Sequence, residues 1–104
     1  MCGIAGLYLL NDSGLDIKDY ISSAISNLSH RGPDDFGIDE LINKRLCLGH
    51  TRLAIQDLTS SGHQPMKFDD YTIVFNGEIY NCLELKAKIN KNLKVEWFSS
   101  SDTE

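Results

Sequence analysis

The 104-residue sequence has no block of lysine or arginine, no CxxC pair of cysteines and no long apolar run. Its formal net charge is −5, and phosphate binding needs clustered cations, so the composition argues against nucleic acid as a partner. The three cysteines are odd in number and far apart, which supports neither a disulfide framework nor a zinc site and suits a reducing, cytoplasmic location. No apolar run approaches the roughly 18 residues that span a bilayer, so we expect no membrane partner.

The length corresponds to one domain, residues 1–104. The apolar run 2–10 ends at turn-forming residues and indicates a buried strand. Apolar residues spaced by three and four predict a helix over residues 16–29. A second helix is predicted near residues 82–93, with Asn81 and Glu84 as a capping box and with apolar residues on one face: Cys82, Leu85, Ile89 and Leu93.

The other segments predict strands and loops. Residues 41–58 alternate as one or two strands, and residues 71–75 and 93–98 are typical of further strands. Glycine and proline predict loops at residues 30–37 and 59–66. Because the helices do not alternate regularly with the strands, the order favours an α+β fold with largely antiparallel pairing.

Cys2 directly follows the start methionine, and it supports two interpretations. It is either a small apolar residue at the start of a strand or, once Met1 is removed, the first residue of the protein. A terminal cysteine carries a thiol and an α-amine on one carbon. A free α-amine has a pKa of about 7.7–8.0, so it can act as the base that a thiol with a pKa of about 8.5 needs.

The pair Asn76-Gly77 follows a strong strand signal. Such a pair normally forms a turn, because both residues tolerate left-handed backbone conformations. It can also form an oxyanion hole, in which the Asn amide and the Gly N–H each stabilise an acyl-transfer transition state by about 3–4 kcal/mol.

Two charged residues allow either a structural or a binding role. Arg52 lies in a strand-like stretch, where it either points to solvent or forks onto a carboxylate. Asp102 either caps a helix that the chain does not continue or binds a cationic group. We expect structural roles for the remaining histidines and cysteines, which show no ligand spacing and therefore predict no metal site: His30, His50, His63, Cys47 and Cys82.

Six short segments occur in a fixed order along the whole chain, and together they are far more specific than any one of them. In this order the sequence resembles the class II glutamine amidotransferase domain, an N-terminal-nucleophile hydrolase fold. It is most similar to the amino-terminal domain of glutamine-hydrolysing asparagine synthetases. The resemblance implies a layered α+β fold of sheets packed with helices. The segments are "MCGIAG", "HRGPDDFG", "LGHTRLAIQDL", "GHQPM", "VFNGEIYN" and "SSSDTE".

The resemblance also implies a role for each matching residue. Cys2 would attack the side-chain amide of glutamine, with its own α-amine as base, and a thioester would form before water releases glutamate. Asn76 and Gly77 would hold the oxyanion, while Arg52 would bind the substrate carboxylate. Asp102 would accept the substrate ammonium, with Glu78 beside the site. The wall next to Arg52 would be formed by Leu53, Ala54, Ile55 and Gln56.

In the family this domain continues and precedes a synthetase domain that binds ATP and magnesium and amidates aspartate. We therefore expect the fold to be incomplete at the C-terminus, with no cofactor in these residues and a synthetase domain or chain as partner. A homodimer is also consistent with the sequence. Two alternatives stay open: a catalytically silent module, and an amidotransferase with another acceptor, such as a sugar.

Overall fold

The protein, described here by a computed structural model covering residues 1–55 and 57–104, is built from two antiparallel sheets and two helices. The first sheet has the strand order β1-β3-β2, and the second is the β4-β5 hairpin. The strands are β1 (Gly3–Tyr8), β2 (Asp35–Leu41), β3 (Leu46–Arg52), β4 (Met66–Phe68) and β5 (Tyr71–Ile73). The helices are α1 (Ile17–Asn27), α2 (Cys82–Asn92) and the 3-10 turn Ser60–Gly62.

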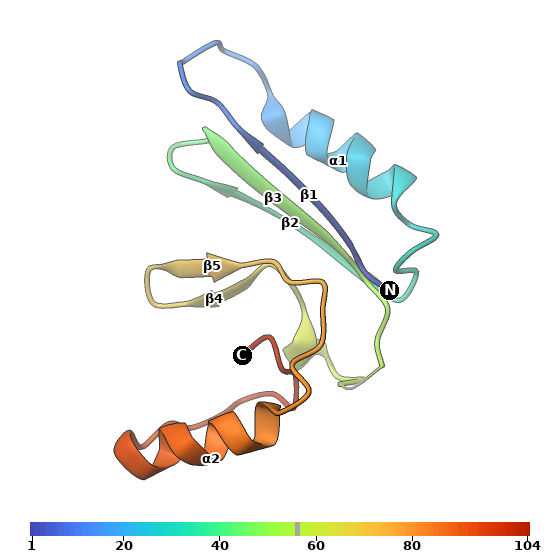
Figure 1. Cartoon of the computed structure of the whole chain (residues 1–104). Coiled ribbons are helices and arrows are strands. Elements are labelled where there is room, and N and C mark those ends of the chain that lie inside the picture. The colour runs from blue at the N-terminus through green and yellow to red at the C-terminus, as the bar shows by residue number, and fades with distance from the viewer. Residues whose placement is uncertain (56) are drawn as a thin grey trace.

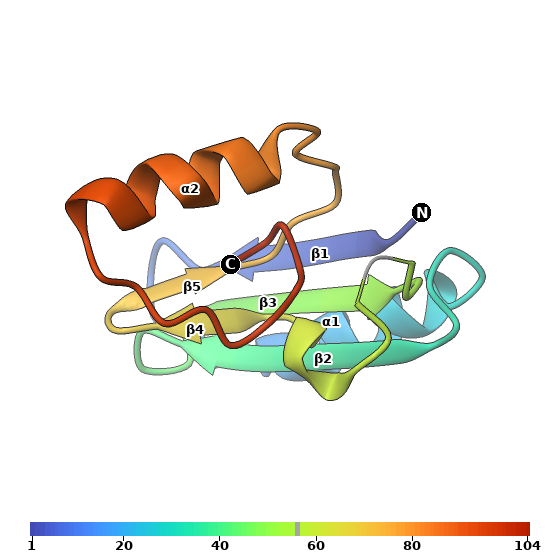
Figure 2. The same ribbon diagram turned by 90° about the horizontal axis from the view of Figure 1, so that it is seen from below.

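The elements are stacked in a fixed order. Helix α1 covers one face of the three-stranded sheet, the β4-β5 hairpin lies on the other side, and α2 lies beyond the hairpin (Figure 1). The view from below shows the C-terminus between α2 and the strands (Figure 2). The predicted α+β fold with antiparallel pairing is confirmed.

The hydrophobic core forms where helix α1 packs against the first sheet. Ile17, Ile21 and Ile25 are buried against the buried Cys47 of β3, as the helical spacing predicts. Asp16 accepts a hydrogen bond from the Lys18 N–H at 3.1 Å and so caps the helix. The core therefore lies between α1 and the sheet, on the face of β3 that Cys47 occupies.

The alternation of side chains along β3 determines which residues face away from that core. Thr51 faces α1, since its hydroxyl donates to the Leu28 carbonyl oxygen at 3.3 Å. Successive side chains of a strand point to opposite faces, so His50 and Arg52 face the β4-β5 hairpin. His50 Nε2 accordingly lies 3.2 Å from the carbonyl oxygen of Phe75.

Several predicted boundaries and environments were wrong. The loop expected over residues 30–37 ends earlier, because Asp35 already pairs with Arg52 in the sheet. Strand β1 is an edge strand, and among its described residues only Gly3 is buried, although the sequence predicted a buried strand. The strand predicted over residues 71–75 stops at Ile73. Of the one or two strands expected over residues 41–58, the described residues form β3, and Leu41 ends β2.

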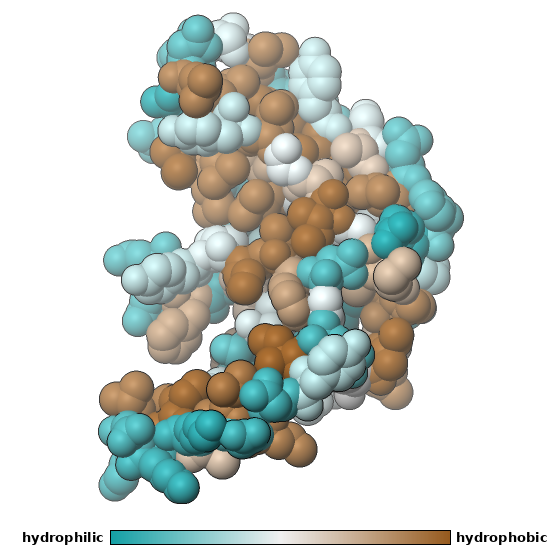
Figure 3. Space-filling view, in the orientation of Figure 1, coloured by the Kyte–Doolittle hydropathy of each residue, from teal (hydrophilic) through white to brown (hydrophobic). Residues whose placement is uncertain are grey.

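The region around α2 differs most from the prediction. No residue of α2, all of which are described, is buried, and Asn81 makes no side-chain cap bond to any described residue. Cys82 is therefore half-buried rather than part of the core. Leu83 and Leu85 are exposed, and apolar side chains gather along this helix (Figure 3). The packed layers of an N-terminal-nucleophile hydrolase stay a prediction.

The strand predicted over residues 93–98 does not form in the described chain. A strand needs a neighbour for its backbone groups, and here side chains replace it: the Glu104 carboxylate accepts from the Phe98 N–H at 2.8 Å. Neither helix found in the described residues is long and apolar enough to cross a membrane.

Candidate functional site

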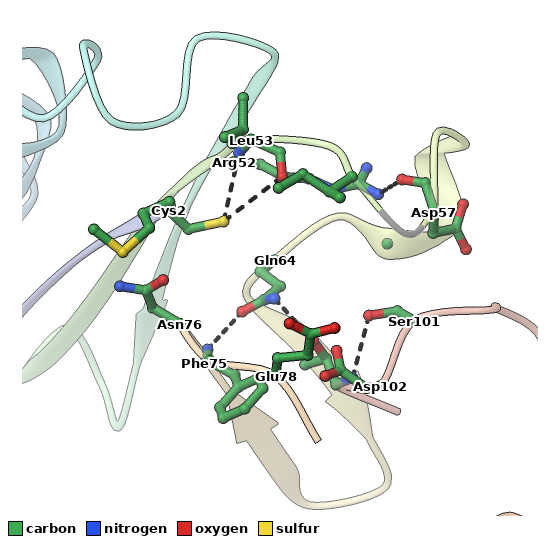
Figure 4. A pocket seen from close by; sticks show the side chains of 15 residues that line it. Cys2, Arg52, Leu53, Asp57, Gln64, Phe75, Asn76, Glu78, Ser101 and Asp102 are labelled. Carbon is green, nitrogen blue, oxygen red and sulfur yellow. Dashed lines mark hydrogen bonds between the residues drawn. The ribbon is translucent and has the colours of Figure 1, made fainter. Parts of the chain in front are cut away.

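A cavity of about 380 Å³ lies on the side of the first sheet that faces away from α1 (Figure 4). Segments from the start, middle and end of the chain line it, so distant parts of the sequence meet here. Its lining includes these residues predicted for the site: Cys2, Arg52, Leu53, Ile55, Asn76, Gly77, Glu78 and Asp102.

The direction of the Cys2 side chain follows from its neighbour Gly3, because successive side chains of an extended chain point to opposite sides. A side chain at Gly3 would lie 2.7 Å from the Thr51 hydroxyl on the α1 face, so Gly3 faces that side and Cys2 faces the cavity. The Leu53 N–H donates to Cys2 Sγ at 3.4 Å, and Arg31 Nε donates to the Cys2 carbonyl oxygen at 3.0 Å. Cys2 is half-buried in the cavity wall and is not part of the core.

Asn76 and Gly77 follow the end of β5 without forming a left-handed turn. Positive φ angles within the described chain occur only at Gly14, Ile42, Asn43, Lys44 and Asp69. Figure 4 shows Asn76 beside Cys2. An oxyanion hole needs donors beside the nucleophile, and Asn76 and Gly77 line the same cavity as Cys2.

Arg52 ends the central strand β3 and is only 8% exposed, so it is not a surface arginine. Its Nη1 donates to the Thr59 carbonyl oxygen at 2.7 Å, and its Nη2 donates to the Asp57 carbonyl oxygen. A guanidinium has five N–H donors, so these two bonds leave further donors of Arg52 for another partner. Gly62 gives the group room, because a side chain there would overlap the guanidinium.

Asp57 connects the residues around Arg52 to the end of the chain. Its carboxylate accepts from the Thr59 hydroxyl at 2.6 Å, from the Thr59 N–H at 2.8 Å and from the Ser100 N–H at 2.9 Å. These bonds, that of the Thr59 hydroxyl first, hold the pKa of the Asp57 carboxyl well below its ordinary value of 3.8. The ionised side chain thus fastens the segment 100–103 to the loop that supports Arg52.

Asp102 and Glu78 lie across the cavity from Arg52 (Figure 4). Asp102 Oδ2 accepts from the Ile79 N–H at 2.7 Å, before α2 begins, so Asp102 does not cap that helix. The cavity therefore has a cation on one side and two carboxylates on the other.

The residues predicted for the wall next to Arg52 lie in different places. Leu53 and Ile55 line the cavity, whereas Ala54 is not among its lining residues and donates its N–H to the Asp34 carboxylate at 2.8 Å. Gln56, also predicted for this wall, lies outside the described residues.

The last residues are held by their own side chains. The Glu104 carboxylate accepts from the Ser99 hydroxyl at 2.8 Å and from the Ser99 N–H at 2.9 Å. Burial by itself would raise the pKa of Glu104, but the bonds from Phe98 and Ser99 outweigh it and lower the pKa. This network fixes the segment on which Asp102 lies.

Sequence reasoning missed four residues that build the site: Arg31, Asp57, Gly62 and Gln64. Gln64 is 5% exposed and lines the cavity, and its side chain binds both Phe75 and Thr103. The motifs "HRGPDDFG", "LGHTRLAIQDL" and "GHQPM" contain all four, but no chemical role pointed to them.

Comparison with known proteins agrees with the resemblance in the sequence. Residues 1–104 match the family described as the glutamine amidotransferase domain. The chain is 43% identical to asparagine synthetase [glutamine-hydrolyzing] 2 of Oryza sativa subsp. japonica and 41% identical to asparagine synthetase [glutamine-hydrolyzing] of Zea mays. It is 35% identical to asparagine synthetase [glutamine-hydrolyzing] 3 of Bacillus subtilis.

Each of these matches covers 100% of this chain but 17% of the relative. The chain thus spans about a fifth or less of the length of such relatives. No solved structure matches it significantly. The predicted resemblance is confirmed by the family match and by the relatives together: the chain belongs to the glutamine amidotransferase domain family.

Proposed function

We propose that this chain hydrolyses glutamine to glutamate and ammonia through Cys2, as the glutaminase half-reaction of an asparagine-synthetase-type amidotransferase. The observation that carries the proposal is the single cavity in which Cys2, Asn76, Gly77, Arg52 and Asp102 meet. Family membership and the names of the relatives support the same reaction.

Substrate binding follows from the charges of the cavity. The α-carboxylate of glutamine lies on the Arg52 side, and its α-ammonium lies against Asp102 and Glu78. A zwitterion placed between these groups directs its side-chain amide toward Cys2. Charge-assisted hydrogen bonds of this kind contribute about 1.5–3 kcal/mol each.

The chemical step requires Met1 to be removed first. Met1 is 74% exposed, so an aminopeptidase can reach it. The α-amine of Cys2 then takes the thiol proton, and the sulfur bonds to the amide carbon of glutamine. Asn76 and Gly77 donate to the oxygen, on which negative charge develops.

The tetrahedral intermediate collapses when the protonated amine of Cys2 gives its proton to the leaving nitrogen. The carbon–nitrogen bond breaks, ammonia leaves, and a thioester remains. Water, deprotonated by the same amine, attacks the thioester carbon. The carbon–sulfur bond breaks, glutamate leaves, and the proton returns to the sulfur.

The use of the ammonia is a further part of the proposal. A synthetase domain outside residues 1–104 would bind ATP and magnesium and amidate aspartate. Within the described residues, no three His, Cys, Asp or Glu side chains gather to hold a metal ion. A sugar acceptor and a silent module are the alternatives.

The test combines mass and activity. We expect the purified protein to lack Met1, to gain one adduct at Cys2 from a glutamine analogue with an electrophilic diazoketone, and to release glutamate. Cys2→Ala should abolish release, whereas the matched variant Cys82→Ala, which removes a half-buried thiol outside the cavity, should not. Retained Met1 without an adduct would favour the silent module.

A further inference from the structure

Gln64 lies in the wall of the cavity, between two segments that carry proposed substrate contacts (Figure 4). Its Oε1 accepts from the Phe75 N–H at 2.6 Å, and its Nε2 donates to the Thr103 hydroxyl at 3.0 Å. Phe75 directly precedes Asn76, and Thr103 directly follows Asp102. One buried amide therefore joins the segment of the oxyanion donors to the segment of the ammonium-binding carboxylate.

The orientation of this amide follows from its partners. A backbone N–H only donates, so the atom facing Phe75 is the oxygen, and the nitrogen faces the Thr103 hydroxyl. Gln64 is 5% exposed, and a buried amide must have both ends bonded. A purely apolar side chain of the same length would fill the space but join neither segment.

Phe75 depends on these side chains for its position. Strand β5 ends at Ile73, so Phe75 lies beyond the ladder that fixes the hairpin. Its carbonyl oxygen accepts from His50 Nε2 at 3.2 Å, and its N–H donates to Gln64. Both backbone groups of the residue before Asn76 are thus held by buried side chains.

Gln64 itself is fixed against the first sheet. A side chain at Gly37 of β2 would overlap the Gln64 carbonyl oxygen and lie 2.7 Å from the His63 ring. The backbone of Gln64 therefore rests directly on β2, and the amide extends from a fixed base.

We propose that Gln64 is a positioning residue for glutamine hydrolysis, because it sets the spacing between the oxyanion donors Asn76 and Gly77 and the substrate-binding Asp102. This inference rests on the proposed function. Gln64 touches neither the substrate nor the reacting atoms in this scheme. A misplacement of about 1 Å in such donors costs about 100-fold in rate.

The experiment measures kcat and KM for glutamine in variants that break the link at each end. Gln64→Met keeps the length but removes both bonds, and we expect kcat to fall about 10- to 100-fold. Gln64→Glu can accept hydrogen bonds from both the Phe75 N–H and the Thr103 hydroxyl, so it should restore most of kcat. Thr103→Val removes one end of the link and should raise KM more than it lowers kcat.

A double-mutant cycle tests whether the effects of Gln64→Met and Thr103→Val depend on each other. Once Gln64→Met has removed the amide, Thr103→Val has no bond left to break, so its effect on KM should largely disappear in the double variant. Thr72→Val in β5, outside the cavity, is the control and should change neither constant. Additive effects of Gln64→Met and Thr103→Val would overturn the inference.

The outcomes separate this inference from the proposed function. A wild-type protein without Met1 that does not hydrolyse glutamine overturns both. An active wild type with unchanged kinetics in Gln64→Met overturns the inference alone. If Gln64→Met does not fold, Thr103→Val decides: a raised KM supports the link, and an unchanged KM contradicts it.

Discussion

The backbone N–H of Leu53 donates to the sulfur of Cys2 at 3.4 Å, across 51 positions of the chain. This bond holds the sulfur next to the end of β3, where Arg52 enters the cavity. The carbonyl of Cys2 is held separately by Arg31 at 3.0 Å. The proposed nucleophile is thus fixed from two directions before any substrate binds, and both restraints can be tested through glutamine hydrolysis.

Arg31→Met should lower kcat about 10- to 100-fold with a smaller change in KM, because it frees Cys2 without touching the substrate contacts. Steady-state glutamate release measures both constants. Arg45→Met is the matched control, since Arg45 also donates to backbone carbonyls, those of Leu9 and Leu10, far from the cavity. Equal kinetics in the two variants would show that Arg31 does not position Cys2.

Gly62→Ala should raise KM for glutamine about tenfold or more while kcat changes less. The added methyl group would overlap the Arg52 guanidinium and displace it from the place proposed for the substrate carboxylate. A lost charge-assisted bond of about 1.5–3 kcal/mol corresponds to roughly 10- to 100-fold in binding. Gly6→Ala in β1, where the new methyl meets only a leucine side chain and a more distant carbonyl, is the control. An unchanged KM in Gly62→Ala would remove Arg52 from the proposed substrate contacts.

Asp57→Asn should lower the stability of the protein and raise KM. An amide would place an N–H₂ group against donors from Thr59 or Ser100, where a carboxylate accepts three bonds. Because these bonds lower the pKa of Asp57 in the folded state, its contribution to stability is present above about pH 4 and is lost as the pH falls below its ordinary value of 3.8.

Urea unfolding at a series of pH values measures this contribution. The difference in unfolding free energy between wild type and Asp57→Asn should stay constant from pH 6 to about pH 5 and shrink as the pH falls through about 4 toward 3. A difference independent of pH would mean that the ionised carboxylate does not hold Ser100.

The site residues could be predicted because six short motifs in a fixed order resemble a known domain. Taken singly, Cys2, Asn76 and Arg52 each allow a structural interpretation as well, and alternation along β3 then carries Arg52 to the cavity face. Asp57 and Gln64 could not be found this way. Their roles come from partners 43 and 39 positions away, and no periodicity encodes such bonds.

The fold likewise contains elements that the local sequence predicts and elements that depend on distant partners. Helix α1 could be predicted, because Ile17, Ile21 and Ile25 form a stripe that packs on the face of the neighbouring three-stranded sheet. Residues 93–98 have strand propensity, but a strand also needs a neighbour to pair with, and side chains such as Glu104 satisfy that backbone instead. Helix α2 has an apolar stripe that the described residues leave uncovered.

Cys47 should resist alkylation in the folded protein. It is fully buried in the core, and burial, helped by Glu40, raises the pKa of its thiol, so little thiolate forms. Cys2 and Cys82 are half-buried and should react first with iodoacetamide. Peptide mass analysis with and without denaturant assigns each adduct. Labelling of native Cys47 as fast as Cys82 would contradict the core packing.

The stability of the protein should decrease as the pH falls below about 6.5 because of His50. The ring is fully buried, and its burial lowers the pKa below 6.5, more than the Phe75 bond and Asp35 raise it, while Arg52 and His63 lower it slightly. The unfolded chain then binds a proton that the folded chain does not, so acid favours unfolding until the folded ring is also protonated.

His50→Gln isolates this effect. A glutamine amide can donate to the Phe75 carbonyl in place of Nε2 but does not titrate. The difference in unfolding free energy between wild type and His50→Gln should be constant from pH 8 to pH 7 and should change in favour of the variant as the pH falls from 6.5. A difference that stays constant to pH 5 would mean that the buried ring accepts a proton in the folded state as readily as in the unfolded chain. His50 could not then be held neutral against Phe75.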